Sequence, residues 1–144
     1  MVDGGMWHGP SLGEATEGLS AAVAAAHPIE GAHSIWELVL HAGQWAEIVG
    51  ERLARRDPEV GPERNFPPVV DVTEAGWSAA VDGMKRRYRA LADLVAGLDA
   101  DALRQEHAGA PGLVAQIEGV VEHGAYHAGQ IVLLRRAAGA WPVE

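Results

Sequence analysis

The stretch "SIWELVLHAGQWAEIVGERLARR", residues 34–56, contains the clearest helical pattern in this 144-residue chain. Ser34 with Glu37 three residues later forms a capping box, which marks the start of a helix. After it, apolar residues recur every three or four positions, as the buried face of a helix requires; they are Ile35, Leu38, Val39, Ala42, Trp45, Ala46, Val49 and Leu53. We therefore predict an amphipathic helix over residues 34–56.

Three other segments have the same period, and no segment shows the alternation of a strand. They predict helices over residues 11–27, 73–98 and 111–138, the first of which begins with a second capping box, Ser11 and Glu14. A chain of this length with nearly half its residues apolar can bury one core. The sequence thus predicts a single all-α domain, residues 1–144, built as a four-helix bundle.

The connections between these helices indicate their directions. The connection between the first and second helices, residues 28–32, is too short to run back along the bundle, so these two helices are expected to be antiparallel neighbours. The proline-rich segment 57–70 could span about 45 Å when extended, whereas a helix of 23 residues is only about 35 Å long. We therefore expect a long crossover that leaves the second and third helices parallel; a surface loop between antiparallel helices is the alternative.

Charge and composition exclude several classes of protein. A formal net charge of −9 repels phosphate backbones, so binding of nucleic acid through a basic face is not expected. The chain has no cysteine, which excludes disulfides, thiolate metal ligands and a cysteine nucleophile. No signal-peptide profile and no run of about 18 apolar residues is present. We expect a soluble, cytoplasmic protein with neither nucleic acid nor membrane as a partner.

The histidines are the candidates for chemistry. His123 and His127 are four residues apart, which places both imidazoles on one helix face, where two nitrogens can bind one metal ion. A third ligand is available in the second helix, where His41 interrupts an apolar run. His33 is the competitor, but it precedes the N-cap Ser34 and so lies at or outside the mouth of that helix. For His8, His27 and His107, in loops or at a helix end, we expect no such role.

Glycines inside the fourth helix point weakly in the same direction. Gly124 and Gly129 each cost about 1 kcal/mol relative to alanine in a helix. They could permit the close approach of another helix or of a ligand. The alternative is that a chain with 18 glycines places some of them in helices without a purpose.

The sequence resembles the DinB/YfiT-like superfamily over nearly its whole length. The resemblance rests on "HSIWELVLHAGQW" (33–45) and "GVVEHGAYHAGQIVLLRRA" (119–137), supported by "WHGPSL" (7–12) and "LDADAL" (98–103). It implies a four-helix bundle in up-down-down-up order and a homodimer. It also implies a divalent metal, often nickel or zinc, held by one histidine of the second helix and two of the fourth, which here are His41, His123 and His127.

Members of that family include S-transferases that use bacillithiol, a mycothiol-dependent maleylpyruvate isomerase and proteins described as metal-dependent hydrolases. The resemblance thus implies a metal-dependent enzyme acting on a small molecule, with a low-molecular-weight thiol as possible cosubstrate. Three neutral ligands leave open positions on an ion, as in catalytic sites. A non-catalytic dimer that binds metal or a small ligand, such as a stress-response module, is the alternative.

No general acid or base stands out in the sequence. Gln44 and Gln130 follow His41 and His127 by about one turn, so either could orient a ligand or a water. Glu37 precedes His41 by one turn, but its position in the capping box favours a structural role. We assign Tyr126 and Glu122 to packing or to the surface.

Overall fold

The computed structural model describes residues 1–4, 6, 7, 9–104 and 112–141. Three long helices dominate it: α3 (Ile35–Leu53), α5 (Glu74–Ala96) and α7 (Leu113–Ala137). The short helices are α1 (Leu12–Thr16), α2 (Ala21–Ala25), α4 (Pro62–Asn65) and α6 (Ala100–Arg104). No strand occurs in the described ranges, so the all-α prediction is confirmed. No helix among those residues combines the length and apolarity needed to cross a membrane.

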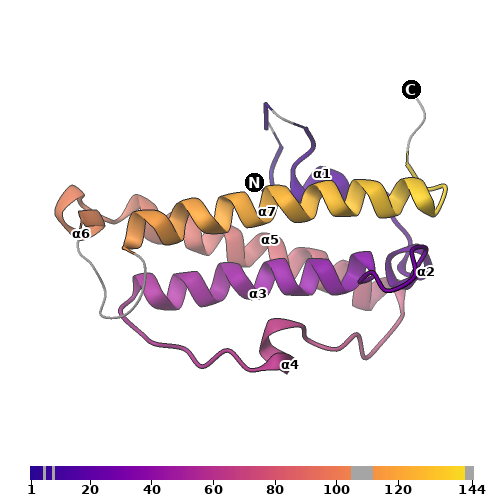
Figure 1. Cartoon of the computed structure of the whole chain (residues 1–144), viewed down its shortest axis with the longest axis horizontal. Helices are drawn as coiled ribbons and strands as arrows, with labels where there is room; N and C mark the ends of the chain where they lie inside the picture. The colour runs from indigo at the N-terminus through magenta and orange to yellow at the C-terminus, as the bar shows by residue number, and fades with distance from the viewer. Residues whose placement is uncertain (5, 8, 105–111, 142–144) are drawn as a thin grey trace.

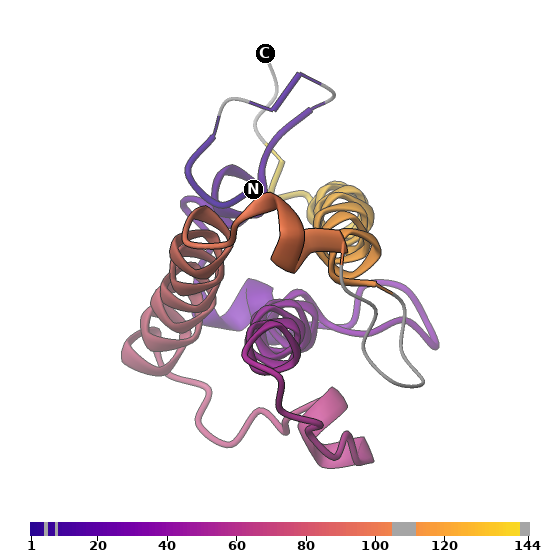
Figure 2. The ribbon, with the colours of Figure 1, turned by 90° about the vertical axis from the view of Figure 1, so that its left-hand side faces the viewer.

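The crossover between α3 and α5 follows the length of the bundle. Figure 1 shows α3 and α5 running in the same direction and α7 in the opposite one. The connecting segment, residues 54–73, includes α4 and runs back outside α3 (Figures 1 and 2). Viewed along the bundle, α3, α5 and α7 occupy the corners of a triangle (Figure 2). As a result, α3 and α7 face each other, and α4 covers part of α3.

The expected first helix, residues 11–27, is wrong as one continuous helix. The capping box of Ser11 and Glu14 is present, but α1 ends after only five residues. Gly18 then adopts a left-handed conformation (φ +71°), which an α-helix cannot continue through. Ser20 caps the separate helix α2, so two short helices stand where the sequence predicted one long one.

The predicted ends of the other helices shift by a few residues. The helix expected to reach residue 56 ends at Leu53, where the chain turns through Arg55 at positive φ (59°). The helix expected over 73–98 spans Glu74–Ala96, with Thr73 as its cap. The fourth ends at Ala137, and its expected start at residue 111 lies outside the described residues.

Close packing holds α3 at the centre of the molecule. A Cβ added to Gly43 would lie 3.1 Å from the Cα of Met84, so the glycine permits α3 and α5 to approach each other closely. The buried indole of Trp77 donates a hydrogen bond to the carbonyl oxygen of Leu19 (2.9 Å), which joins α5 to the segment between α1 and α2. The Arg135 guanidinium donates a hydrogen bond to a backbone carbonyl of α1, which joins α7 to α1.

The two glycines singled out in the fourth helix behave differently. A Cβ on Gly124 would lie 2.8 Å from Met1 Sδ and 3.0 Å from the Tyr88 hydroxyl, so close approach explains this glycine. Gly129 is exposed, and no atom of the described residues lies within 4 Å of the place its Cβ would occupy. The approach of another helix is therefore wrong as an explanation of Gly129.

Candidate metal centre

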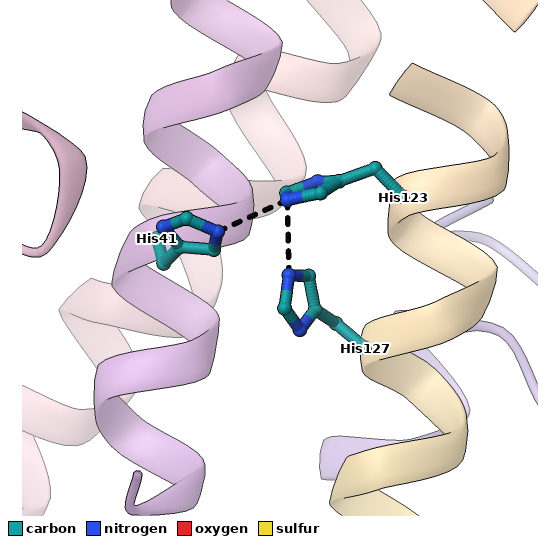
Figure 3. Close-up of side chains that lie close together, drawn as sticks. All are labelled: His41, His123 and His127. Atoms are coloured by element: carbon teal, nitrogen blue, oxygen red, sulfur yellow. Dashed lines mark hydrogen bonds between the residues drawn. The ribbon is translucent and has the colours of Figure 1, made fainter. Parts of the chain in front are cut away.

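Three histidines from two helices converge between α3 and α7. His41 comes from α3, and His123 and His127 come from successive turns of α7 (Figure 3). The Nε2 atom of His123 lies 3.0 Å from Nε2 of His41 and 2.9 Å from Nε2 of His127. One nitrogen from each ring can be chosen so that all three lie within 4.8 Å of one another. The structure thus brings together the three residues that the sequence proposed as metal ligands.

Hydrogen bonds at the outer nitrogens set the tautomers of two of these rings. Nδ1 of His41 lies 2.7 Å from the carbonyl oxygen of Asn65, which can only accept, so Nδ1 carries the proton. Nδ1 of His127 lies 2.6 Å from Oε1 of Gln130 and donates in the same way. In both neutral rings Nε2 therefore has no proton and carries a lone pair, and both lone pairs point at Nε2 of His123.

The ring of His123 cannot donate a hydrogen bond to both of these lone pairs. A neutral imidazole has one proton, so Nε2 of His123 can donate to His41 or to His127 but not to both. Its Nδ1 is buried, and no described residue forms a hydrogen bond with it. The centre therefore has more nitrogen lone pairs than protons to fill them, which is the condition of a site built for a cation.

The distances between the three Nε2 atoms, like the tautomers of the rings, fit a bound metal ion. Histidine nitrogens bind zinc at about 2.0–2.1 Å. Two such nitrogens at a right angle around one ion would lie about 3 Å apart, close to the 3.0 and 2.9 Å observed here. Imidazole suits zinc, nickel, copper and iron. The residues present could hold one divalent ion of this group.

Burial keeps the three rings neutral. Burial, together with smaller contributions from the neighbouring His127 and His41, lowers the pKa of His123 from 6.5 to about 4. Burial also lowers the pKa of His41 and of His127, although the hydrogen bonds to Asn65 and Gln130 partly oppose this. Neutral imidazoles are the form that binds metal, so near neutral pH no proton has to leave before a cation binds.

Gln130 is the one candidate supporting residue that contacts the centre. While its Oε1 accepts from His127, its Nε2 donates to the hydroxyl of Tyr126 (3.1 Å). The Tyr126 ring also contacts the His127 ring, with centroids 5.1 Å apart. The assignment of Tyr126 to packing or surface therefore overlooked its part in orienting His127 through Gln130, although the side chain is exposed.

The other two candidates lie away from the centre. Glu37 accepts the backbone N–H of Ser34 (2.7 Å) and approaches His33, which is the capping role that the sequence favoured. Gln44 forms no hydrogen bond with the three histidines in the part of the chain described here. The competitor His33 stacks on one side of Phe66 with ring centroids 4.0 Å apart and does not join the group of three.

The crossover supplies residues that sequence reasoning missed. Asn65, the last residue of α4, accepts from His41 through its backbone oxygen and from the Trp45 indole through its side chain (2.9 Å). Phe66 stacks on the His41 ring with centroids 4.0 Å apart. In the sequence they stand in the aperiodic segment 57–70, so only the "NF" before two prolines could have drawn attention to them.

A cavity of about 460 Å³ opens beside the histidines, between α3 and the first half of α7. His41 and His123 line one part of it, and Trp45, Val49, Val120 and Arg52 line much of the rest. This volume is typical of sites for small molecules. No aspartate or glutamate is among its described lining residues.

Comparison with known proteins identifies one family. A model of the DinB superfamily matches residues 10–131, which include all three histidines and most of the chain. No curated protein and no solved structure shows significant similarity to the chain.

Proposed function

We propose that this chain, which belongs to the DinB superfamily, is a metal-dependent enzyme that transfers a small thiol to an electrophilic substrate. His41, His123 and His127 would hold one nickel or zinc ion. The observation that carries the proposal is the convergence of three neutral imidazoles beside a cavity of small-molecule size.

The ion would supply Lewis-acid chemistry, since a divalent metal with three neutral protein ligands keeps open positions and lowers the pKa of a water or thiol. The chain itself would orient the ligands. The Asn65 carbonyl holds His41 in the tautomer that directs Nε2 inward, and Gln130 does the same for His127. Phe66 limits rotation of the His41 ring by stacking on it.

The lining of the cavity favours thiol transfer over hydrolysis. Metal-assisted hydrolysis commonly uses a carboxylate as general base or acid, and none lies among the cavity's described lining residues. A thiol needs less help, because its ordinary pKa of about 8.5 is already near neutral. The chain has no cysteine, so the sulfur would come from a cosubstrate.

Metal analysis is the first test. Protein purified without an affinity tag should contain about one divalent ion per chain, and His123→Ala should lose it. His27→Ala, which removes an exposed histidine outside the centre, is the matched control and should retain the metal. A wild-type protein that neither contains nor takes up nickel or zinc would rule the proposal out.

Turnover is the second test. Electrophiles such as epoxides and activated aryl halides would be screened with several low-molecular-weight thiols, and product formation measured by mass spectrometry. Thioether product that disappears in His127→Ala supports transfer, whereas hydrolysed product without thiol incorporation would favour a hydrolase.

A non-catalytic homodimer that sequesters a small ligand is the second candidate. It is motivated by the lack of a carboxylate among the described residues that line the cavity, which leaves no clear proton donor for a reaction. Binding of metal and ligand without turnover would support it, and size-exclusion chromatography with light scattering would test the dimer.

A further inference from the structure

Arg52 is the one formal charge among the described residues that line the cavity beside the histidines. It lies in the last turn of α3 and is half-buried. Its guanidinium carbon lies 5.6 Å from the centroid of the Trp45 ring, and that ring lies 5.8 Å from the ring of His123. The Trp45 ring therefore lies close to both the cation and the metal centre, and all three groups line the same cavity.

The carboxylates that could neutralise Arg52 are engaged elsewhere. On the same helix, Glu51 binds Arg64 at 2.6 Å and Glu47 binds Arg87. Within the described part of the chain, no carboxylate oxygen lies within ion-pair distance of Arg52. In a protein whose net charge is −9, a cation in a cavity without an acidic partner is unusual.

The remaining walls are largely apolar. Val49, Val120 and Ala115 contribute aliphatic surface, and Gly119 leaves open space, since no described atom lies within 4 Å of the place its Cβ would occupy. An arginine fork pairs with a carboxylate through two parallel hydrogen bonds, and it does so more strongly when water is partly excluded. The cavity thus combines an apolar body with an anion-binding end.

We propose that Arg52 is a substrate-recognition residue, and that the cavity selects small apolar molecules that carry a carboxylate. The acid group would pair with the Arg52 guanidinium, the apolar body would lie against Trp45 and Val120, and the opposite end would face His41 and His123. This inference rests on the proposed function, because it names the class of substrate for that centre.

A cation in the last turn also stabilises the helix end, which is the structural explanation of Arg52. The two roles make different predictions. A helix-terminal charge affects stability alone, whereas a recognition residue discriminates a carboxylate from a neutral group of the same shape. Arg56→Gln, in the exposed segment just after α3, removes the same charge outside the cavity and serves as the matched control.

The experiment measures binding of phenylacetate and of its neutral isostere phenylacetamide to zinc-treated protein. Calorimetry would give the affinities, and ¹H–¹⁵N NMR would locate binding through the Trp45 indole signal. We expect the wild type and Arg56→Gln to bind the acid about tenfold more tightly than the amide, as one additional arginine–carboxylate pair of about 1.4 kcal/mol would give. Arg52→Gln should abolish the preference, and Arg52→Lys should retain part of it.

Filling the cavity gives a second measurement. In Gly119→Leu the new Cβ meets no described atom within 4 Å, so we expect the fold to persist while the added side chain displaces both probes. An acid preference that survives in Arg52→Gln would mean that the metal binds the carboxylate and would overturn the inference. Equal binding of acid and amide, or no binding of either, would overturn it too.

Metal content is measured on the same samples. A protein that binds zinc but shows no Arg52-dependent acid preference would refute this inference and leave the proposed function standing. Failure of the wild type to bind zinc would refute the proposed function, and the acid preference at Arg52 would still be measured on the same samples.

Discussion

Acidification of the metal-free protein should destabilise it, because the histidine centre is folded in its neutral form. Burial lowers the pKa of His123 from 6.5 to about 4. Between these two values the unfolded chain binds more protons than the folded one, so the free energy of unfolding falls as the pH falls. The stabilisation is complete above the unfolded pKa of 6.5, and its loss is complete below about pH 4.

The size of the effect follows from the shift. At pH 5 an unfolded imidazole is almost fully protonated, whereas a ring with a pKa of about 4 is about nine-tenths neutral, which corresponds to about 2 kcal/mol. His123 is only partly buried, and solvent screens part of this energy, so we expect it to contribute a loss of about 1 kcal/mol between pH 7 and pH 5. His41 and His127, whose pKa values are lowered for the same reason, add to the loss.

Urea unfolding followed by far-ultraviolet circular dichroism at pH 7 and pH 5, with EDTA present, measures this loss. His123→Gln removes the ring, so the difference in free energy between the two pH values should shrink by about 1 kcal/mol relative to the wild type. Excess zinc should stabilise the wild type more at pH 7 than at pH 5, because protons compete with the metal. An identical pH dependence in wild type and His123→Gln would refute the reasoning.

Three further predictions follow from particular contacts. Gln130→Leu should weaken zinc affinity by about tenfold or more, since His127 loses the acceptor that orients it, and competition with a zinc chelator would measure this; unchanged affinity would contradict that role. Gly129→Ala should raise the free energy of unfolding by up to about 1 kcal/mol, because alanine is the better helix former. Gly43→Ala should instead lower it by about 1 kcal/mol, because the new methyl would lie only 3.1 Å from the Cα of Met84 and would push α3 and α5 apart; equal urea midpoints for the two variants would contradict the packing described. Trp77→Phe should cost about 1–3 kcal/mol in urea unfolding, because a buried carbonyl loses its donor, and a loss well below 1 kcal/mol would show that water replaces the indole.

Local sequence pattern was sufficient to predict those features of the fold that depend on residues close together in the sequence. The capping boxes at Ser11 and Ser34 form as expected, and the apolar periodicity located α3, α5 and α7 to within a few residues. Periodicity did not reveal the break near Gly18, because the apolar residues on either side continue a helical spacing. Gly18 is left-handed there, a conformation that glycine adopts without steric cost and that apolar spacing does not reveal.

The histidine centre was also predictable from the sequence only where it depends on local spacing. The i, i+4 spacing places His123 and His127 on one face of α7, which is a property of any helix, and the apolar surroundings of His41 distinguished it from His33. The contacts of Asn65 and Phe66 with His41 were not predictable, since they depend on where an aperiodic crossover lies against α3.

The sequence by itself determined the helical class, the likeness to the DinB superfamily and the three histidines as a candidate set, because helical period and residue spacing are local properties. Only the tertiary structure decided that the Nε2 atoms of these histidines converge, that a crossover carbonyl fixes the tautomer of His41, and that Arg52 faces a cavity with no acidic partner among the described residues. These features depend on the register of α3 against α7 and on the course of the crossover. Both are set by the packing of the whole core, which no single segment specifies.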